Sequence, residues 1–97
     1  MRKRAIIEST SKPALPAHVR LRFDDLRQRW ALLAPEKVMW PDDVSLDILQ
    51  RCTGKATTAD IVRELTAEYA APEPEIRQDV MTFLQEWADQ QIVICED

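Results

Sequence analysis

The sequence predicts a small α+β domain in which a three-stranded antiparallel sheet precedes three helices. Two patterns favour this order. Apolar and polar residues alternate from Val19 to Asp24, which is typical of a strand with one buried face. Apolar residues then recur at helical spacing in three later segments. A chain of 97 residues, 45% of them apolar, is expected to form one domain with one modest core.

The three strands are expected before residue 41. Val19 to Asp24 forms the first, residues 30–34 the second and residues 37–40 the third. Pro35 lies between the last two, where its missing N–H does not interrupt a ladder. Residues 1–14 mix charged, Ser, Thr and Pro residues without an apolar period. We therefore expect a mobile basic tail over residues 1–14 and a domain over residues 15–97.

Two shorter helices are expected next. Asp42 can cap the first helix, whose apolar positions run from Val44 to Cys52. Gly54 is expected at the C′ position, which needs a positive φ. Thr57 and Asp60 have the spacing of a capping box at the start of the second helix.

A longer third helix is expected from about residue 72. Its start contains two proline and two glutamate residues, which suit a helix N-terminus. Its apolar stripe runs from Ile76 to Trp87, and residues 92–94 form a short apolar segment that could be a strand. Three helices with a small sheet resemble a winged helix.

Catalytic and metal chemistry find little support in the sequence. His18 is the one histidine, with no partner of recognisable role, and a single Gly leaves no phosphate-binding loop. Cys52 and Cys95 form no CxxC pair. We expect a cytoplasmic, non-enzymatic protein without cofactor or metal, with reduced cysteines and no signal peptide or membrane span.

The charge pattern disfavours nucleic acid. The net charge is −4, and the third helix, which would read DNA in a winged helix, carries Glu73, Glu75 and Asp79 around Arg77. These carboxylates would repel a phosphate backbone.

The second and third strands raise a different question. Leu32 and Leu33 are adjacent, as are Val38, Met39 and Trp40, so both faces of the ribbon would be apolar. The second face has three candidate covers: the chain's own residues 92–94, a second copy of the domain, or a partner peptide. The sequence leaves the choice among them open.

Strand addition is the peptide-binding mode that fits this ribbon. An extended peptide can pair with an open sheet edge, and side-chain pockets then select its sequence. The third strand would supply the floor of a groove and the third helix its opposite wall. Spacing alone favours the alternative that the helix stripe is simply core, whereas for the third strand the two interpretations are closer.

Most of the chain closely resembles the pyrroloquinoline quinone biosynthesis protein D family. The resemblance lies in the stretch RWALLAPEKVMWPDDVSLDILQRCTGKATTADIVRELTAEY and in the later stretch EIRQDVMTFLQEWADQQIV. The resemblance covers roughly residues 16–94. Thr53 stands where the family usually has Asp, and Pro41-Asp42 where it often has leucine and asparagine. The most specific positions are Leu32 to Glu36, Ile48-Leu49, Cys52 with Gly54, Asp79-Val80 and Phe83-Leu84.

The resemblance implies a winged-helix-like peptide chaperone that is not itself a catalyst. Such domains recognise the leader of a ribosomally made precursor peptide and present it to a radical S-adenosylmethionine enzyme, which crosslinks a Glu and a Tyr in that peptide. The leader docks on the third strand against the third helix. The implied peptide-binding positions are Lys37, Val38, Met39, Trp40, Ile76, Arg77, Val80, Phe83, Leu84 and Trp87.

Two other functions remain as alternatives. One is a winged-helix DNA-binding regulator, which the acidic third helix disfavours. The other is a purely self-associating domain, in which a second copy occupies the open edge as a homodimer or by strand exchange.

Overall fold

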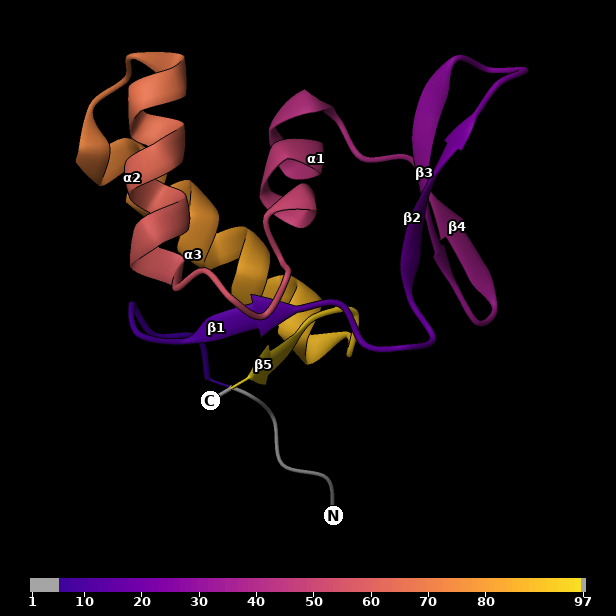
Figure 1. Ribbon diagram of the computed structural model, residues 1–97, viewed down its shortest axis with the longest axis horizontal. Coiled ribbons are helices and arrows are strands. Elements are labelled where there is room, and N and C mark those ends of the chain that lie inside the picture. The colour runs from indigo at the N-terminus through magenta and orange to yellow at the C-terminus, as the bar shows by residue number, and fades with distance from the viewer. Residues whose placement is uncertain (1–5, 97) are drawn as a thin grey trace.

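The computed structural model describes residues 6–96, and it confirms the predicted α+β class (Figure 1). A three-stranded antiparallel ribbon precedes three helices, and a second, two-stranded sheet lies below them. The elements are β1 (Lys12–Ala14), β2 (Arg20–Asp24), β3 (Arg29–Ala34), β4 (Lys37–Met39), α1 (Asp43–Gln50), α2 (Thr58–Tyr69), α3 (Glu73–Asp89) and β5 (Ile94–Glu96).

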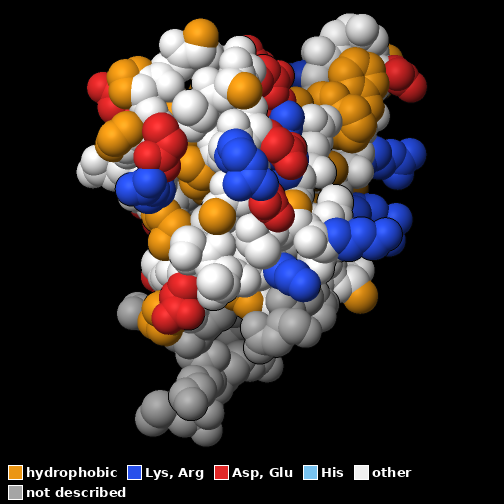
Figure 2. All heavy atoms as spheres, turned by 60° about the vertical axis from the view of Figure 1, so that its left-hand side comes forward, with side chains coloured by type: hydrophobic (Ala, Val, Ile, Leu, Met, Phe, Trp, Pro, Cys, Tyr) orange, Lys and Arg blue, Asp and Glu red, His pale blue; other side chains and the backbone are white. Residues whose placement is uncertain are grey.

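The ribbon consists of β2, β3 and β4 in that spatial order. It stands beside the helices, with α1 between it and the α2–α3 pair (Figure 1). Asp24 accepts a hydrogen bond from the Arg27 backbone N–H at 3.0 Å in the β2–β3 turn, and Pro35 and Glu36 form the β3–β4 turn. Figure 2 shows a hydrophobic patch and several Lys and Arg side chains along the right-hand edge, the side on which the ribbon lies.

The second sheet corrects the expected mobile tail. β1 pairs antiparallel with β5, with Pro13 opposite Cys95, and Ile7 is buried in the core. The backbone N–H groups of Thr58 and Ala59, in the first turn of α2, donate to carbonyls of residues 11 and 9 at 2.8 and 3.0 Å. The first N–H groups of a helix have no acceptor within that helix, so they can bind the backbone of another segment. Backbone hydrogen bonds of this kind hold the segment before β1, and they require no apolar periodicity in its sequence. Residues 1–5 of the expected tail lie outside the described residues.

The helix caps follow the sequence closely. Asp42 accepts the Ser45 N–H at 2.8 Å, and Thr57 and Asp60 form the predicted reciprocal capping box. Gly54 has the expected positive φ of 82°. It lies beyond the α1 cap residue Arg51, however, and its N–H donates to the Pro13 carbonyl at 2.9 Å. Gly54 therefore lets the α1–α2 loop pair with the backbone of β1, and it does not end the helix itself.

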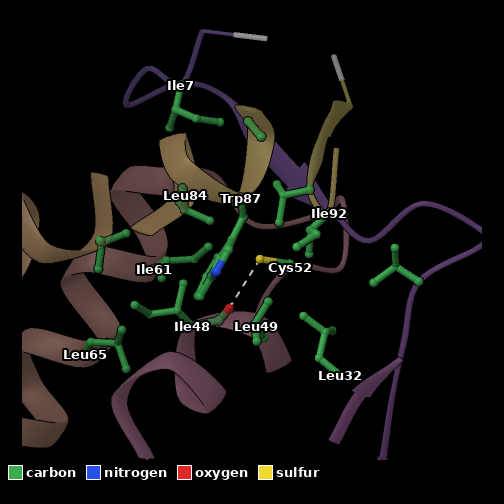
Figure 3. Packing of buried hydrophobic residues seen from close by; sticks show 14 of the residues in the cluster. Ile7, Leu32, Ile48, Leu49, Cys52, Ile61, Leu65, Leu84, Trp87 and Ile92 are labelled. Carbon is green, nitrogen blue, oxygen red and sulfur yellow. Dashed lines mark hydrogen bonds between the residues drawn. The ribbon is translucent and has the colours of Figure 1, made fainter. Parts of the chain in front are cut away.

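The core lies where all three helices meet the inner side of the ribbon and the β5 segment. Figure 3 shows the Trp87 side chain of α3 pointing toward Ile48 and Cys52, whose thiol donates to the Ile48 carbonyl at 3.3 Å. Leu32 enters the same cluster from β3 and is 1% exposed. Burial raises the pKa of the Cys52 thiol to about 12, so this thiol behaves as a small apolar side chain.

Acid should destabilise the fold through its helix caps. Backbone N–H groups that donate to Asp42 and Asp60 lower the pKa of both carboxyls below the ordinary value of 3.8. A lowered folded pKa adds stability above the unfolded pKa, and this stability is lost as the pH falls through the folded pKa. We expect the melting temperature to fall between about pH 5 and about pH 3, and Asp60→Asn to flatten this dependence. Thermal melts across that pH range measure this dependence, and Asp79→Asn, on the exposed side of α3, is the control. If the melting temperature of Asp60→Asn changed with pH as steeply as that of the unaltered chain, the expectation would be contradicted.

Candidate functional site

The β4 strand offers an open backbone edge. It pairs with β3 on one side and is the last strand of the ribbon. Ala34 and Lys37 pair across the two-residue turn, and Leu33 pairs with Val38. Because antiparallel pairs alternate between hydrogen-bonded and non-hydrogen-bonded, the N–H and C=O of Val38 point away from β3. An incoming strand could use both groups.

The side chains of β4 divide between two faces of the ribbon. Met39 lies opposite Leu32 and packs partly buried against the core, on what we call the inner face. Val38 lies opposite Leu33 and is 53% exposed. We call this other side the outer face; by strand register it comprises Arg20, Arg22, Asp24, Arg29, Ala31, Leu33 and Val38.

The structure answers in part what covers the second apolar face. Ile92 and Val93 are buried in the core, and Ile94 belongs to β5, which pairs with β1. The chain's own C-terminal segment therefore does not cover the outer face. Val38 and Trp40 line a hollow of about 550 Å³ there, whereas both were predicted to lie in a groove against the third helix.

The predicted α3 positions are also divided. Val80, Leu84 and Trp87 are buried members of the core. Ile76 and Phe83 are partly buried at its margin, and the Phe83 ring stacks on the Trp87 ring with centroids 5.5 Å apart. The exposed Arg77 is ion-paired with Glu73.

One contact brings the start of β4 beside the end of α3. The Lys37 Nζ atom donates to Gln90 Oε1 at the long distance of 3.5 Å. Met39 on β4 and Phe83 on α3 are both partly buried against the core. The peptide-binding set predicted from sequence thus contains exposed strand positions, marginal helix positions and core positions.

Several outer-face residues were not among the site residues predicted from the sequence. Arg22, Ala31 and Leu33 line the same hollow as Trp40, together with Arg27 from the β2–β3 turn. The guanidinium carbons of Arg27 and Arg29 lie 5.4 and 4.9 Å from the Trp40 ring centroid. The alternating pattern of residues 19–24 was visible in the sequence. Aligning it with β3 would have placed Arg20 and Arg22 opposite Leu33 and Ala31.

Titratable side chains gather between α1 and α2, where Arg51 is ion-paired with both Glu64 and Glu68. His18 is exposed in the turn before β2. Within residues 6–96, no cluster of three or more His, Cys, Asp or Glu side chains could hold a metal ion. The helices of this described part are too short or too polar to cross a membrane.

The fold and this edge define a winged-helix-like α+β domain, a class of scaffold that can take an extended peptide as an added strand. Residues 29–93 match the sequence profile of the family described as "Coenzyme PQQ synthesis protein D (PqqD)". The chain belongs to this PqqD family.

Curated relatives support the same assignment. A "PqqA binding protein" of Rhodopseudomonas palustris (strain CGA009) is 48% identical over 87 residues, covering 90% of this chain and 85% of the relative. A "PqqA binding protein" of Xanthomonas axonopodis pv. citri is 45% identical over 75 residues, covering 77% of this chain and 82% of the relative.

Two solved structures share the fold. The solution NMR structure of the PqqD truncation of Methylobacterium extorquens PqqCD, a stand-alone recognition element for ribosomally synthesized and modified peptides, superposes with a TM-score of 0.76 at 32% identity. That match covers 91% of this chain and 94% of the other. The crystal structure of PqqD from Xanthomonas campestris gives a TM-score of 0.56 at 40% identity, over 89% of this chain and 96% of the other.

Proposed function

We propose that this chain is a peptide chaperone of pyrroloquinoline quinone biosynthesis, which binds the precursor peptide PqqA as a strand added to the edge of β4. The open edge at Val38 is the observation that carries the proposal. Membership of the PqqD family and the names of the relatives support the choice of peptide.

In strand addition, backbone hydrogen bonds provide affinity and side-chain contacts provide sequence selectivity. Hydrogen bonds from the outward N–H and C=O of Val38 would hold any extended backbone. Alternate side chains of that backbone would face the margin of the core, where Met39 and Phe83 are only partly buried. Apolar side chains of the peptide would complete the burial of these two and so select the sequence.

The chaperone would then present the bound peptide to a radical S-adenosylmethionine enzyme. Holding the leader on a domain that also contacts the enzyme makes capture of the reacting segment nearly intramolecular. The gain needs no catalytic group in this chain.

Titration with synthetic PqqA, followed by backbone amide shifts of the labelled protein, tests the proposal. We expect saturating shifts at Lys37, Val38 and Met39 with a one-to-one stoichiometry. Sedimentation with and without PqqA distinguishes the homodimer that sequence analysis left open. A stable dimer that binds no PqqA would support self-association instead.

Glu73→Lys should leave PqqA binding nearly unchanged. Glu73 lies at the start of α3, far along the helix from Gln90, and its ion pair with Arg77 is largely solvent-exposed. An exposed charge of this kind is expected to change the binding free energy by less than about 1 kcal/mol. Isothermal calorimetry of the variant measures this, and a large loss would move the peptide site toward the N-terminus of α3.

A further inference from the structure

We propose that the outer face of the ribbon is a second docking surface, which takes an acidic segment of a partner protein that also carries an apolar side chain. This surface is separate from the β4 edge and goes beyond the function proposed above. It rests on an open hollow, on the arginines around it and on the register of the ribbon.

Among the described residues, the hollow has an apolar floor that is partly exposed. Leu33 and Val38 are opposite each other on β3 and β4, and Trp40 lies beside them in the hollow of about 550 Å³. Val38 and Trp40 remain 53% and 37% exposed. Neighbouring apolar side chains exposed on one sheet face mark an interaction surface, since burying them removes apolar area from water.

Arginines surround this floor. Arg20, Arg22 and Arg29 lie on the outer face by register, and Arg29 and Arg27 lie over the Trp40 ring. Arg27 is ion-paired with Asp24 at 3.0 Å. Within residues 6–96, no ion pair is formed by Arg20, Arg22 or Arg29, so these three guanidinium groups are available to a carboxylate.

Charge selects an acidic occupant. The whole chain has a net charge of −4, yet its ribbon presents arginines at one face. The planar guanidinium groups of Arg22 and Arg29 can bind carboxylates through paired N–H donors. An apolar side chain between those carboxylates would fill the space over Leu33 and Val38.

A protein segment fits this face better than nucleic acid does. Asp24 and Asp25 also line the hollow, and they would repel a continuous row of phosphates. A segment with carboxylates at a few positions can meet the free arginines and avoid these two aspartates.

The two surfaces can be occupied together. Val38 turns its backbone N–H and C=O to the β4 edge and its side chain to the outer face. A peptide strand added to the edge lies in the plane of the ribbon, whereas the acidic segment would lie across it.

A designed probe tests the proposal: a 12-residue peptide of alternating Glu and Leu, with a matched peptide of alternating Gln and Leu. We expect the acidic peptide alone to shift the Trp40 indole N–H and the amides of Arg22 and Leu33, with affinity that falls as salt rises. Arg22→Glu and Arg29→Glu should each weaken it about tenfold or more, as reversal of a paired charge does, while Lys55→Glu, in the α1–α2 loop, should not. The amide spectra of the variants confirm that they are folded.

The same variants separate this proposal from the proposed function. Arg22→Glu and Arg29→Glu should bind PqqA as the unaltered chain does, and protein saturated with PqqA should still bind the acidic probe. The proposal is overturned if the Gln peptide binds equally well, if short duplex DNA shifts the same residues more strongly, or if these residues are found to be buried by a second copy. Failure of PqqA to bind at the β4 edge would overturn the proposed function and leave the outer-face titration unaffected.

Discussion

Val38→Pro should abolish most of the affinity for PqqA. The Val38 N–H points to the open edge rather than to β3, so proline there removes a bond to the peptide and leaves the β3–β4 ladder in place. The peptide carbonyl that loses its donor would be left unsatisfied, which costs about 1–3 kcal/mol, or roughly 5- to 150-fold in affinity. Calorimetry with synthetic PqqA measures the loss.

Val38→Ala is the matched control for this substitution. It keeps the backbone N–H and removes only two methyl groups of a side chain that is 53% exposed. We expect it to bind PqqA within about threefold of the unaltered chain, since little apolar area is lost. Equal affinities for the proline and alanine variants would show that the peptide does not pair with this edge.

Leu84→Ala should lower the stability of the fold, although Leu84 was among the peptide contacts predicted from the sequence. The side chain is 0% exposed and belongs to the cluster around Trp87 (Figure 3). Truncating a fully buried leucine removes apolar contacts and leaves a cavity, so we expect the free energy of unfolding to fall by about 2–5 kcal/mol. Urea denaturation measures this change.

Leu84→Met gives the corresponding control. It nearly conserves side-chain volume, and such exchanges usually cost less than about 1.5 kcal/mol. If Leu84→Ala unfolded at the same urea concentration as the unaltered chain but lost PqqA affinity, Leu84 would belong to the groove and the core assignment would be wrong.

The helices and their starts were predictable because their signals are local. Asp42 and the pair Thr57 and Asp60 bind backbone N–H groups three residues away or less, so spacing alone identifies them. The β2–β3–β4 ribbon was predictable for a similar reason, since its turns connect strands that are adjacent in the sequence.

The β1–β5 sheet was not predictable in this way. Its strands are three residues each and lie at opposite ends of the chain, so no local turn joins them. The segment before β1 is fixed by Ile7 in the core and by two N–H groups at the start of α2, which donate to carbonyls of this segment. Neither contact produces a periodic pattern of apolar residues from which a strand or helix could be predicted.

The candidate site shows the same division. The apolar stripe of α3 is visible in the sequence, but only Val80, Leu84, Trp87 and Ala88 of its 17 residues are buried. The sequence could not separate Leu84, at 0% exposure, from the partly buried Phe83 beside it. Burial depends on which elements pack against each side of the helix.

The sequence by itself determined the α+β class, the order of the ribbon and helices, the caps and the family, because these depend on neighbouring residues and on joint spacing. Tertiary structure alone decided that Ile7 and β1 join the fold, which face of the ribbon meets the core, and that Val38, Trp40 and the arginines share the opposite face. Those outcomes depend on contacts between distant segments, and the register of a strand pair, rather than the pattern of one strand, sets which side chains lie together.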